Sequence, residues 1–171
     1  MDVMQRKICL LGDFAVGKTS LVRRFVYNKF EADYLATIGV HVSRKEVKVG
    51  LDPARRVALV IWDLAGGETF SHMEEAYYRG SAGALLVADV TRPDTFGMLN
   101  TYATTFMRIN PNAALVFAFN KVDLQPDNSA YAAAAEELAT RWQAPYYLTS
   151  ALTGESVEDA FKTLAASLLG N

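Results

Sequence analysis

The chain has 171 residues, of which 51% are hydrophobic and 21% are charged, a balance typical of a folded globular protein and not of a disordered tail. Its 17 Lys and Arg residues against 19 Asp and Glu residues give a formal net charge of −2, so bulk charge suggests neither nucleic acid nor an acidic membrane as a partner. The length fits one domain over residues 1–171, large enough to bury a substantial core.

The single cysteine, Cys9, lies in an apolar run and cannot form an internal disulfide, which fits a reducing compartment. No secretory signal precedes the first predicted strand, and no apolar stretch approaches the roughly 20 residues of a membrane span. The last residues, AASLLGN, contain no cysteine for a prenyl group. We therefore expect a cytoplasmic protein, with membrane association only if a lipidated tail lies outside this sequence.

Short β-rich apolar runs alternate with segments of helical period along the chain. Strands are predicted at 7–11, 57–64, 82–90, 115–120 and 145–149, and helices at 18–28, around 74–78, and at 94–109, 129–142 and 157–169. Residues 40–62 predict two strands joined by a turn at 50–53, which would make one edge strand antiparallel. Apolar strands without polar alternation are what a parallel sheet covered on both faces requires. The expected fold is therefore a doubly wound α/β fold, with a mostly parallel six-stranded sheet, one antiparallel edge strand and ligands beyond the carboxyl ends of the strands.

The first predicted strand ends in GDFAVGKTS, which matches G-x-x-x-x-G-K-[ST] from Gly12 to Thr19. The glycines let successive backbone N–H groups point inward, and the following helix presents its positive N-terminal end to phosphates. Lys18 can reach the outer phosphates, and Thr19 can place a hydroxyl on Mg²⁺, which prefers hard oxygen ligands. The motif indicates a nucleoside triphosphate without naming the base. A plain glycine turn is the alternative, but a strand before and a helix after are the context that the motif requires.

The strand predicted at 57–64 contains one acid, Asp63, and is followed by the adjacent glycines Gly66 and Gly67. The strand at 115–120 runs into Asn120, Lys121 and Asp123. A carboxylate at 123 can accept hydrogen bonds from the N1–H and the exocyclic amine of guanine, a donor pair that adenine lacks. The next strand ends in TSAL at 149–152, where the backbone N–H of residue 151 could donate to the guanine O6.

With these motifs in place, the chain resembles a small GTPase of the Ras superfamily, nearest in texture to the Rab branch. The resemblance is carried by GDFAVGKTS, ATIG, WDLAGGE, YYRG, LLVADVTRPDTF, NKVD and TSAL, which follow one another at family-like spacing over nearly the whole chain. It implies the phosphate-loop small GTPase fold and a monomeric GTP-binding switch that hydrolyses GTP. The implied cofactors are GTP or GDP and Mg²⁺, and the implied partners are an effector, an exchange factor and an activating protein.

The resemblance also implies a residue-level site. Metal binding is expected from Thr19, Thr37 and Asp63, and catalysis from Gly66, Gly67, Thr37 and Lys18. Gly66 would give its N–H to the γ-phosphate, Phe30 would lie edge-on to the guanine and Tyr34 would close over the phosphates. The expected nucleotide-binding residues are Asp13, Phe14, Ala15, Val16, Gly17, Lys18, Thr19, Ser20, Phe30, Tyr34, Thr37, Gly66, Asn120, Lys121, Asp123, Ser150, Ala151 and Leu152.

Two positions depart from the family pattern. Gly67 stands where relatives usually carry the glutamine that orients the attacking water, and Phe14 is bulky where relatives carry a small residue. Loss of one positioned polar group costs about 10²–10³ in rate, so hydrolysis is expected to be slow. Glu68 and His72 are the nearby side chains that could substitute for the glutamine. Phe14 could obstruct an activating arginine or fold back against the second switch.

Two functions remain open from the sequence: a switch that cycles by slow hydrolysis, and a binding module that stays loaded with GTP. An ATP-using kinase is disfavoured by the NKVD motif and by the absence of an acceptor-site domain. Rab-like proteins present three aromatic residues to effectors. Trp62 and Tyr77 match two of them, while Val42 occupies the third position; Trp62 could equally be a covered core residue.

Overall fold

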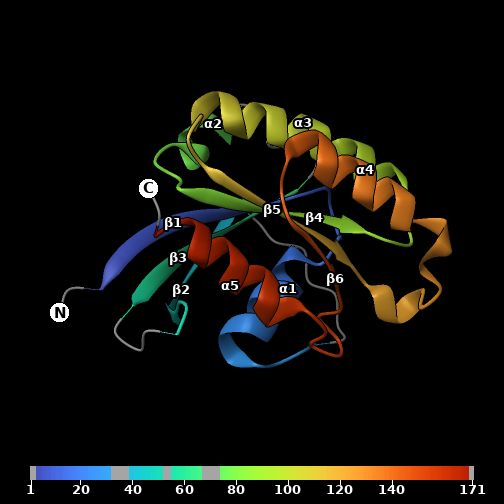
Figure 1. Ribbon diagram of the computed structural model, residues 1–171, viewed down its shortest axis with the longest axis horizontal. Coiled ribbons are helices and arrows are strands. Elements are labelled where there is room, and N and C mark those ends of the chain that lie inside the picture. The colour runs from blue at the N-terminus through green and yellow to red at the C-terminus, as the bar shows by residue number, and fades with distance from the viewer. Residues whose placement is uncertain (1–2, 32–38, 52–54, 67–73, 170–171) are drawn as a thin grey trace.

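A computed structural model describes residues 3–31, 39–51, 55–66 and 74–169 of the chain (Figure 1). Its centre is a six-stranded sheet in the order β2-β3-β1-β4-β5-β6. β2 pairs antiparallel with β3, and the other neighbouring strands pair in parallel, which confirms the predicted doubly wound sheet with one antiparallel edge. The strands are β1 Met4–Leu11, β2 Val40–Lys48, β3 Arg56–Leu64, β4 Gly83–Asp89, β5 Ala114–Asn120 and β6 Tyr146–Thr149.

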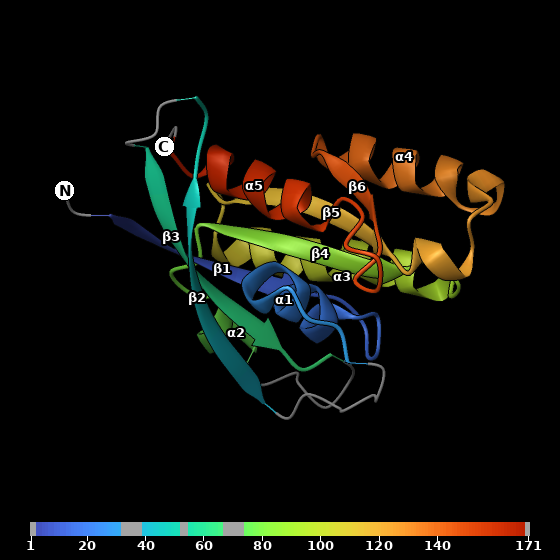
Figure 2. The ribbon, with the colours of Figure 1, turned by 90° about the horizontal axis from the view of Figure 1, so that it is seen from below.

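Helices cover both faces of this sheet (Figures 1 and 2). α2, α3 and α4 lie on one face, and α1 and α5 lie on the other. Their bounds are α1 Lys18–Tyr27, α2 Glu74–Tyr78, α3 Asp94–Ile109, α4 Ala132–Trp142 and α5 Val157–Ser167, with short 3₁₀ turns at Val122–Leu124 and Asn128–Ala130. None of the described helices is both long enough and apolar enough to span a membrane.

Each face of the sheet has its own apolar core. Under α1 and α5, the Phe25 and Phe161 rings stack with centroids 4.1 Å apart and a 2° angle between their planes. On the other face, Phe117 and Phe119 of β5 pack with Phe96 and Phe106 of α3. Strands buried on both faces are the reason for their almost uninterrupted apolar sequences.

Strand register places four polar residues along one edge of the sheet. Asp63 of β3 lies beside Leu10 of β1, and Asp89 of β4 lies beside Asn120 of β5. Asn120 in turn pairs with Thr149 at the end of β6. The carboxyl ends of the parallel strands therefore gather these side chains around the loop between β1 and α1.

Two predicted boundaries were wrong by three residues, while the others agree with the structure to within two. β1 begins at Met4 rather than at residue 7, because its first residues pair with β3 through Met4 and Val57 although Met4 and Gln5 are exposed. The helix predicted from residue 129 begins at Ala132, after the 3₁₀ turn at 128–130. There the Asp127 carboxylate accepts the Ser129 N–H at 3.0 Å, and Tyr131 has a non-helical φ of −133°, which together separate the turn from the helix.

Candidate nucleotide-binding site

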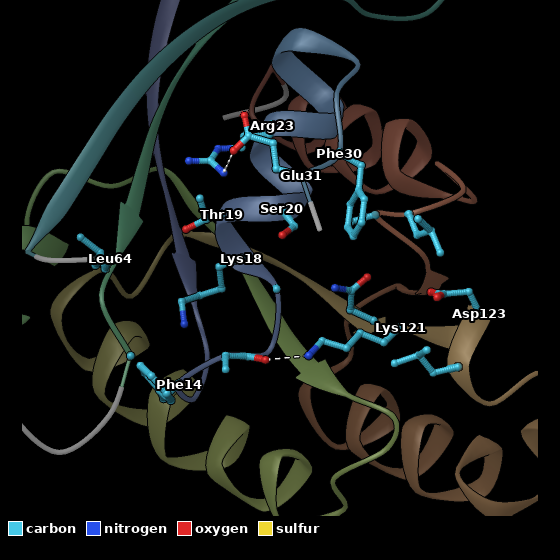
Figure 3. Close-up of a pocket in the computed structure, with 17 residues that line it drawn as sticks. Phe14, Lys18, Thr19, Ser20, Arg23, Phe30, Glu31, Leu64, Lys121 and Asp123 are labelled. Carbon is cyan, nitrogen blue, oxygen red and sulfur yellow. Dashed lines mark hydrogen bonds and ion pairs between the residues drawn. The ribbon is translucent and has the colours of Figure 1, made fainter. Parts of the chain in front are cut away.

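A cavity of about 310 Å³ opens at the carboxyl edge of the sheet (Figure 3). Thirteen of the residues predicted to bind nucleotide line it: Phe14, Ala15, Gly17, Lys18, Thr19, Ser20, Phe30, Gly66, Asn120, Lys121, Asp123, Ala151 and Leu152. Four further residues line it that sequence motifs did not identify: Arg23, Glu31, Leu64 and Leu124. Asp13, Val16 and Ser150 are absent from the lining, and Tyr34, Thr37 and Gly67 lie outside the described residues.

Two glycines allow close packing at the phosphate loop, residues 12–17, one against a side chain and one against backbone. Gly17 has a φ of +101°, and a Cβ there would lie 2.3 Å from Asn120 Nδ2. A Cβ on Gly66 would lie 2.6 Å from the Gly12 carbonyl oxygen. Glycine is therefore required at both positions, and the chain after β3 lies directly against the phosphate loop.

Lys18, the first residue of α1, is buried at 7% exposure. Its ammonium donates to the carbonyl oxygens of Gly12 and Asp13, each at 2.9 Å. Burial lowers the pKa of Lys18 to about 8, while Asp63 and Asp13 act in the opposite direction and Arg92 lowers it further. The site thus presents one desolvated cation to which an anion could bind strongly.

Asp63 and Thr19 form the second polar element of the site. The Thr19 hydroxyl donates to Asp63 Oδ2 at 2.6 Å. Asp63 is 1% exposed, and within the described residues its Oδ1 is buried with no hydrogen-bond partner. Burial raises the pKa of Asp63, while the Thr19 hydroxyl and the Lys18 ammonium lower it. A hydroxyl beside a buried, unpartnered carboxylate oxygen is a donor set that fits Mg²⁺.

Three short hydrogen bonds hold the opposite end of the cavity. The Ser150 hydroxyl donates to Asp123 Oδ1 at 2.7 Å, so Ser150 orients the carboxylate from outside the lining. Asn120 Nδ2 donates to the Val16 carbonyl at 3.1 Å, and Asn120 Oδ1 accepts from the Thr149 hydroxyl at 3.0 Å. Asn120 therefore ties the phosphate loop to the end of β6, and Asp123 is the carboxylate that lines this end of the cavity.

Arg24, which no sequence motif singled out, joins the two ends of the site. It lies in the last turn of α1, and its Nε donates to the Ala151 carbonyl at 2.8 Å. Its Nη2 donates to the Leu152 carbonyl at 2.7 Å. The helix that begins at the phosphate loop therefore also fixes the loop that follows β6.

Around Trp62, the three positions matched to effector-binding aromatics lie close together. Trp62 and Tyr77 are half-buried, with ring centroids 6.0 Å apart, and Val42 is directly opposite Trp62 in the β2–β3 pair. Val42 is 49% exposed, and the Lys7 ammonium lies 3.8 Å from the Trp62 ring centroid. Trp62 is accordingly a partly accessible surface residue and not a covered core residue.

The fold and the cavity together define a class of protein: a phosphate-loop nucleotide-binding protein with its ligand site at the carboxyl edge of a doubly wound sheet. The family model described as "Ras family" matches residues 7–170. The chain is 38% identical over 164 residues to human "Ras-related protein Rab-4B", covering 95% of this chain and 76% of that protein. Mouse "Ras-related protein Rab-4A" matches at the same identity over 95% of this chain and 74% of its own length.

The chain therefore belongs to the Ras family, as a Rab-like small GTPase of the Ras superfamily. Members of this family are GTP-binding regulatory switches, and the family resemblance expected from the motifs is confirmed.

Proposed function

We propose that this chain is one guanine-nucleotide-binding domain over residues 1–171 that binds GTP and GDP with Mg²⁺, recruits effectors in its GTP state and hydrolyses GTP slowly. The observation that carries nucleotide binding is a single cavity lined by Lys18 and Thr19 at one end and by Asp123 at the other. The end with Lys18 and Thr19 would bind the phosphates, and the end with the Asp123 carboxylate would bind the guanine base.

Base selection rests on Asp123. Its carboxylate, oriented by Ser150, would accept hydrogen bonds from the guanine N1–H and exocyclic amine. The Ala151 backbone, held by Arg24, would supply the N–H for the guanine O6. Adenine would leave the carboxylate unpaired, which is the physical basis of selection for guanine.

Mg²⁺ would be held by Thr19 and Asp63, with Thr37 as a further ligand expected from the family. When bound, the ion supplies charge neutralisation of the phosphate oxygens. The residues of this chain would orient the nucleotide around it: Lys18 would exchange its bonds to Gly12 and Asp13 for bonds to phosphate oxygens.

Slow hydrolysis follows from Gly67, which has no side chain that could orient the attacking water. Phe14 supports a second candidate, a module that stays loaded with GTP and has negligible GTPase activity. It lines the cavity and is 49% exposed, so its ring would compete for the space into which an activating protein inserts an arginine. In either case the exposed surface around Val42, Trp62 and Tyr77 is the effector contact we propose.

Single-turnover hydrolysis tests this proposal. Purified protein is loaded with GTP and Mg²⁺, and phosphate release is followed with and without the substitution Gly67→Gln. Unassisted family members hydrolyse GTP at about 10⁻⁴ s⁻¹. We expect a slower rate for wild type and an increase of about tenfold or more for Gly67→Gln, because a carboxamide that positions water is restored.

Gly97→Gln is the matched control, since Gly97 lies in α3 with open space around the position of a Cβ. A wild-type rate at the family value, unchanged by Gly67→Gln, would contradict slow hydrolysis. No measurable rate in either protein, with GTP still bound, would favour the permanently loaded module.

A further inference from the structure

Consecutive carbonyl groups of the phosphate loop are each bound by a cation from outside the loop. Arg92 Nη2 donates to the Phe14 carbonyl oxygen at 2.6 Å. Lys121 Nζ donates to the Ala15 carbonyl oxygen at 2.8 Å. Arg92 lies after β4, separated from Phe14 by 78 positions, and it is not among the residues that line the cavity.

One buried carboxylate anchors both cations. Asp89, the last residue of β4, is 1% exposed. Its Oδ2 lies 3.2 Å from Arg92 Nε and 3.0 Å from Lys121 Nζ. Burial acts to raise the pKa of Asp89, but hydrogen bonds from Thr91 and Lys121 lower it overall, so the carboxylate stays ionised. The two donors are therefore fixed in position and are not free surface side chains.

The two bound carbonyls flank a residue with an unfavourable backbone conformation. Ala15 has a φ of +60°, in the left-handed region where a residue with a Cβ pays a conformational cost. In a planar trans peptide the N–H points opposite to the C=O. Because Arg92 binds the Phe14 carbonyl, the N–H of Ala15 in the same peptide unit points away from Arg92. Because Lys121 binds the Ala15 carbonyl, the N–H of Val16 likewise points away from Lys121. Successive N–H groups turned in this way form an anion-binding nest.

We infer that Arg92 is a positioning residue for nucleotide binding: bridging Asp89 to the Phe14 carbonyl, it holds Ala15 in its left-handed conformation and aims the loop N–H groups at the phosphates. This inference rests on the proposed function. It gives Arg92 a role that depends on its forked guanidinium, because one nitrogen contacts the carboxylate while another contacts the loop.

The test measures release of a fluorescent GDP analogue from protein with Mg²⁺, chased with excess GDP. We expect Arg92→Ala to release the nucleotide about tenfold faster than wild type, since a hydrogen bond to a charged donor is lost. Arg92→Lys should release it at an intermediate rate, because an ammonium keeps the charge beside Asp89 without the fork. Arg108→Ala is the matched control, since Arg108 forms an exposed ion pair with Glu75 at 2.8 Å and its variant should match wild type.

The same measurement in an Ala15→Gly background separates positioning from general loss of structure. Glycine tolerates a positive φ, so the effect of Arg92→Ala should fall to about threefold or less there. The inference would be overturned if Arg92→Ala accelerated release of the GDP analogue as much in the Ala15→Gly background as in wild type. It would also be overturned if Arg92→Lys released the analogue at the wild-type rate, or if Arg92→Ala released it at the same rate as Arg108→Ala. If Arg92→Ala does not fold, the release rate of Arg92→Lys is compared instead between the wild-type and Ala15→Gly backgrounds. Wild-type protein that binds no GDP would instead refute the proposed function.

Discussion

Lys18 holds its charge at a cost in free energy. Its ammonium is buried among loop carbonyls, and its two bonds to Gly12 and Asp13 only partly replace the water it has lost. Because its pKa is about 8, Lys18 loses this charge within a pH range that is accessible to binding experiments. Because only the charged form pairs with a phosphate, nucleotide binding and proton binding at Lys18 are coupled.

We therefore expect GDP affinity to be constant below pH 8 and to fall as the pH rises above it, by up to about tenfold per pH unit. A titration of Kd from pH 6.5 to 9 measures this. The control is Lys18→Arg, whose guanidinium stays charged and should show no step near pH 8. A flat wild-type profile would contradict the coupling.

Lys18 also links pH to the stability of the fold. Its folded pKa of about 8 lies below the ordinary value of 10.5, so the unfolded chain binds this proton more tightly. The contribution of Lys18 to the free energy of unfolding therefore increases as the pH rises from about 8 toward 10.5.

Sequence patterns identified residues that line the cavity but not those that position them. Lys18, Thr19 and Asp123 belong to short motifs whose chemistry can be stated from residue type and spacing. Arg24 and Arg92 act on backbone carbonyls 127 and 78 positions away in the chain. Nothing in the local sequence specifies such contacts, since they are created only when the helices pack on the sheet.

At the scale of elements, α1 and α5 are the pair that supports the phosphate loop. α1 begins directly after the loop, and its Phe25 ring stacks on Phe161 of α5 at 4.1 Å. Both rings are buried, so this contact anchors the helix that follows the phosphate loop against α5.

Phe161→Ala should lower the free energy of unfolding by about 3–5 kcal/mol, the cost of removing a large buried ring. Urea unfolding of the GDP-bound protein measures this loss. The neighbouring Lys162→Ala removes an exposed pair with Glu158 and should cost less than about 1 kcal/mol. Equal losses in the two variants would show that the stacked pair contributes little.

Whether a segment forms a strand or a helix was easier to predict from the sequence than the residues at which it begins and ends. Apolar runs such as 57–64 predicted buried parallel strands because burial on both faces demands them. The first residues of β1 could not be predicted in this way, since Met4 and Gln5 are exposed and are held by pairing with β3 alone. Pairing partners become visible only in the folded sheet.

For the whole molecule, the ligand site lies where several elements meet, so the ligand itself should stabilise the fold. The cavity is lined by residues from the phosphate loop, α1, the end of β3 and the loops after β5 and β6. Any ligand that binds the folded state alone raises the free energy of unfolding by mass action.

Removing GDP with a chelator and excess phosphatase should therefore lower Tm. A ligand at 100 times its Kd contributes about 2.7 kcal/mol, which corresponds to roughly 5–10 °C for a chain of this size. Thermal unfolding with GDP and Mg²⁺, compared with ADP and Mg²⁺, measures it. ADP should give little shift, and an equal shift with ADP would refute selection by Asp123.

Helix α1 has a geometric consequence of its own. Its ten residues begin at Lys18 and reach Arg24 one or two turns later, where the side chain grips the Ala151 and Leu152 carbonyls. A helix rises about 1.5 Å per residue, and its hydrogen-bonded backbone does not stretch. α1 therefore sets the distance between the phosphate loop, where the phosphates would bind, and the loop after β6, where the base would bind. Because the helix is stiff, this distance stays the same when the surrounding loops move.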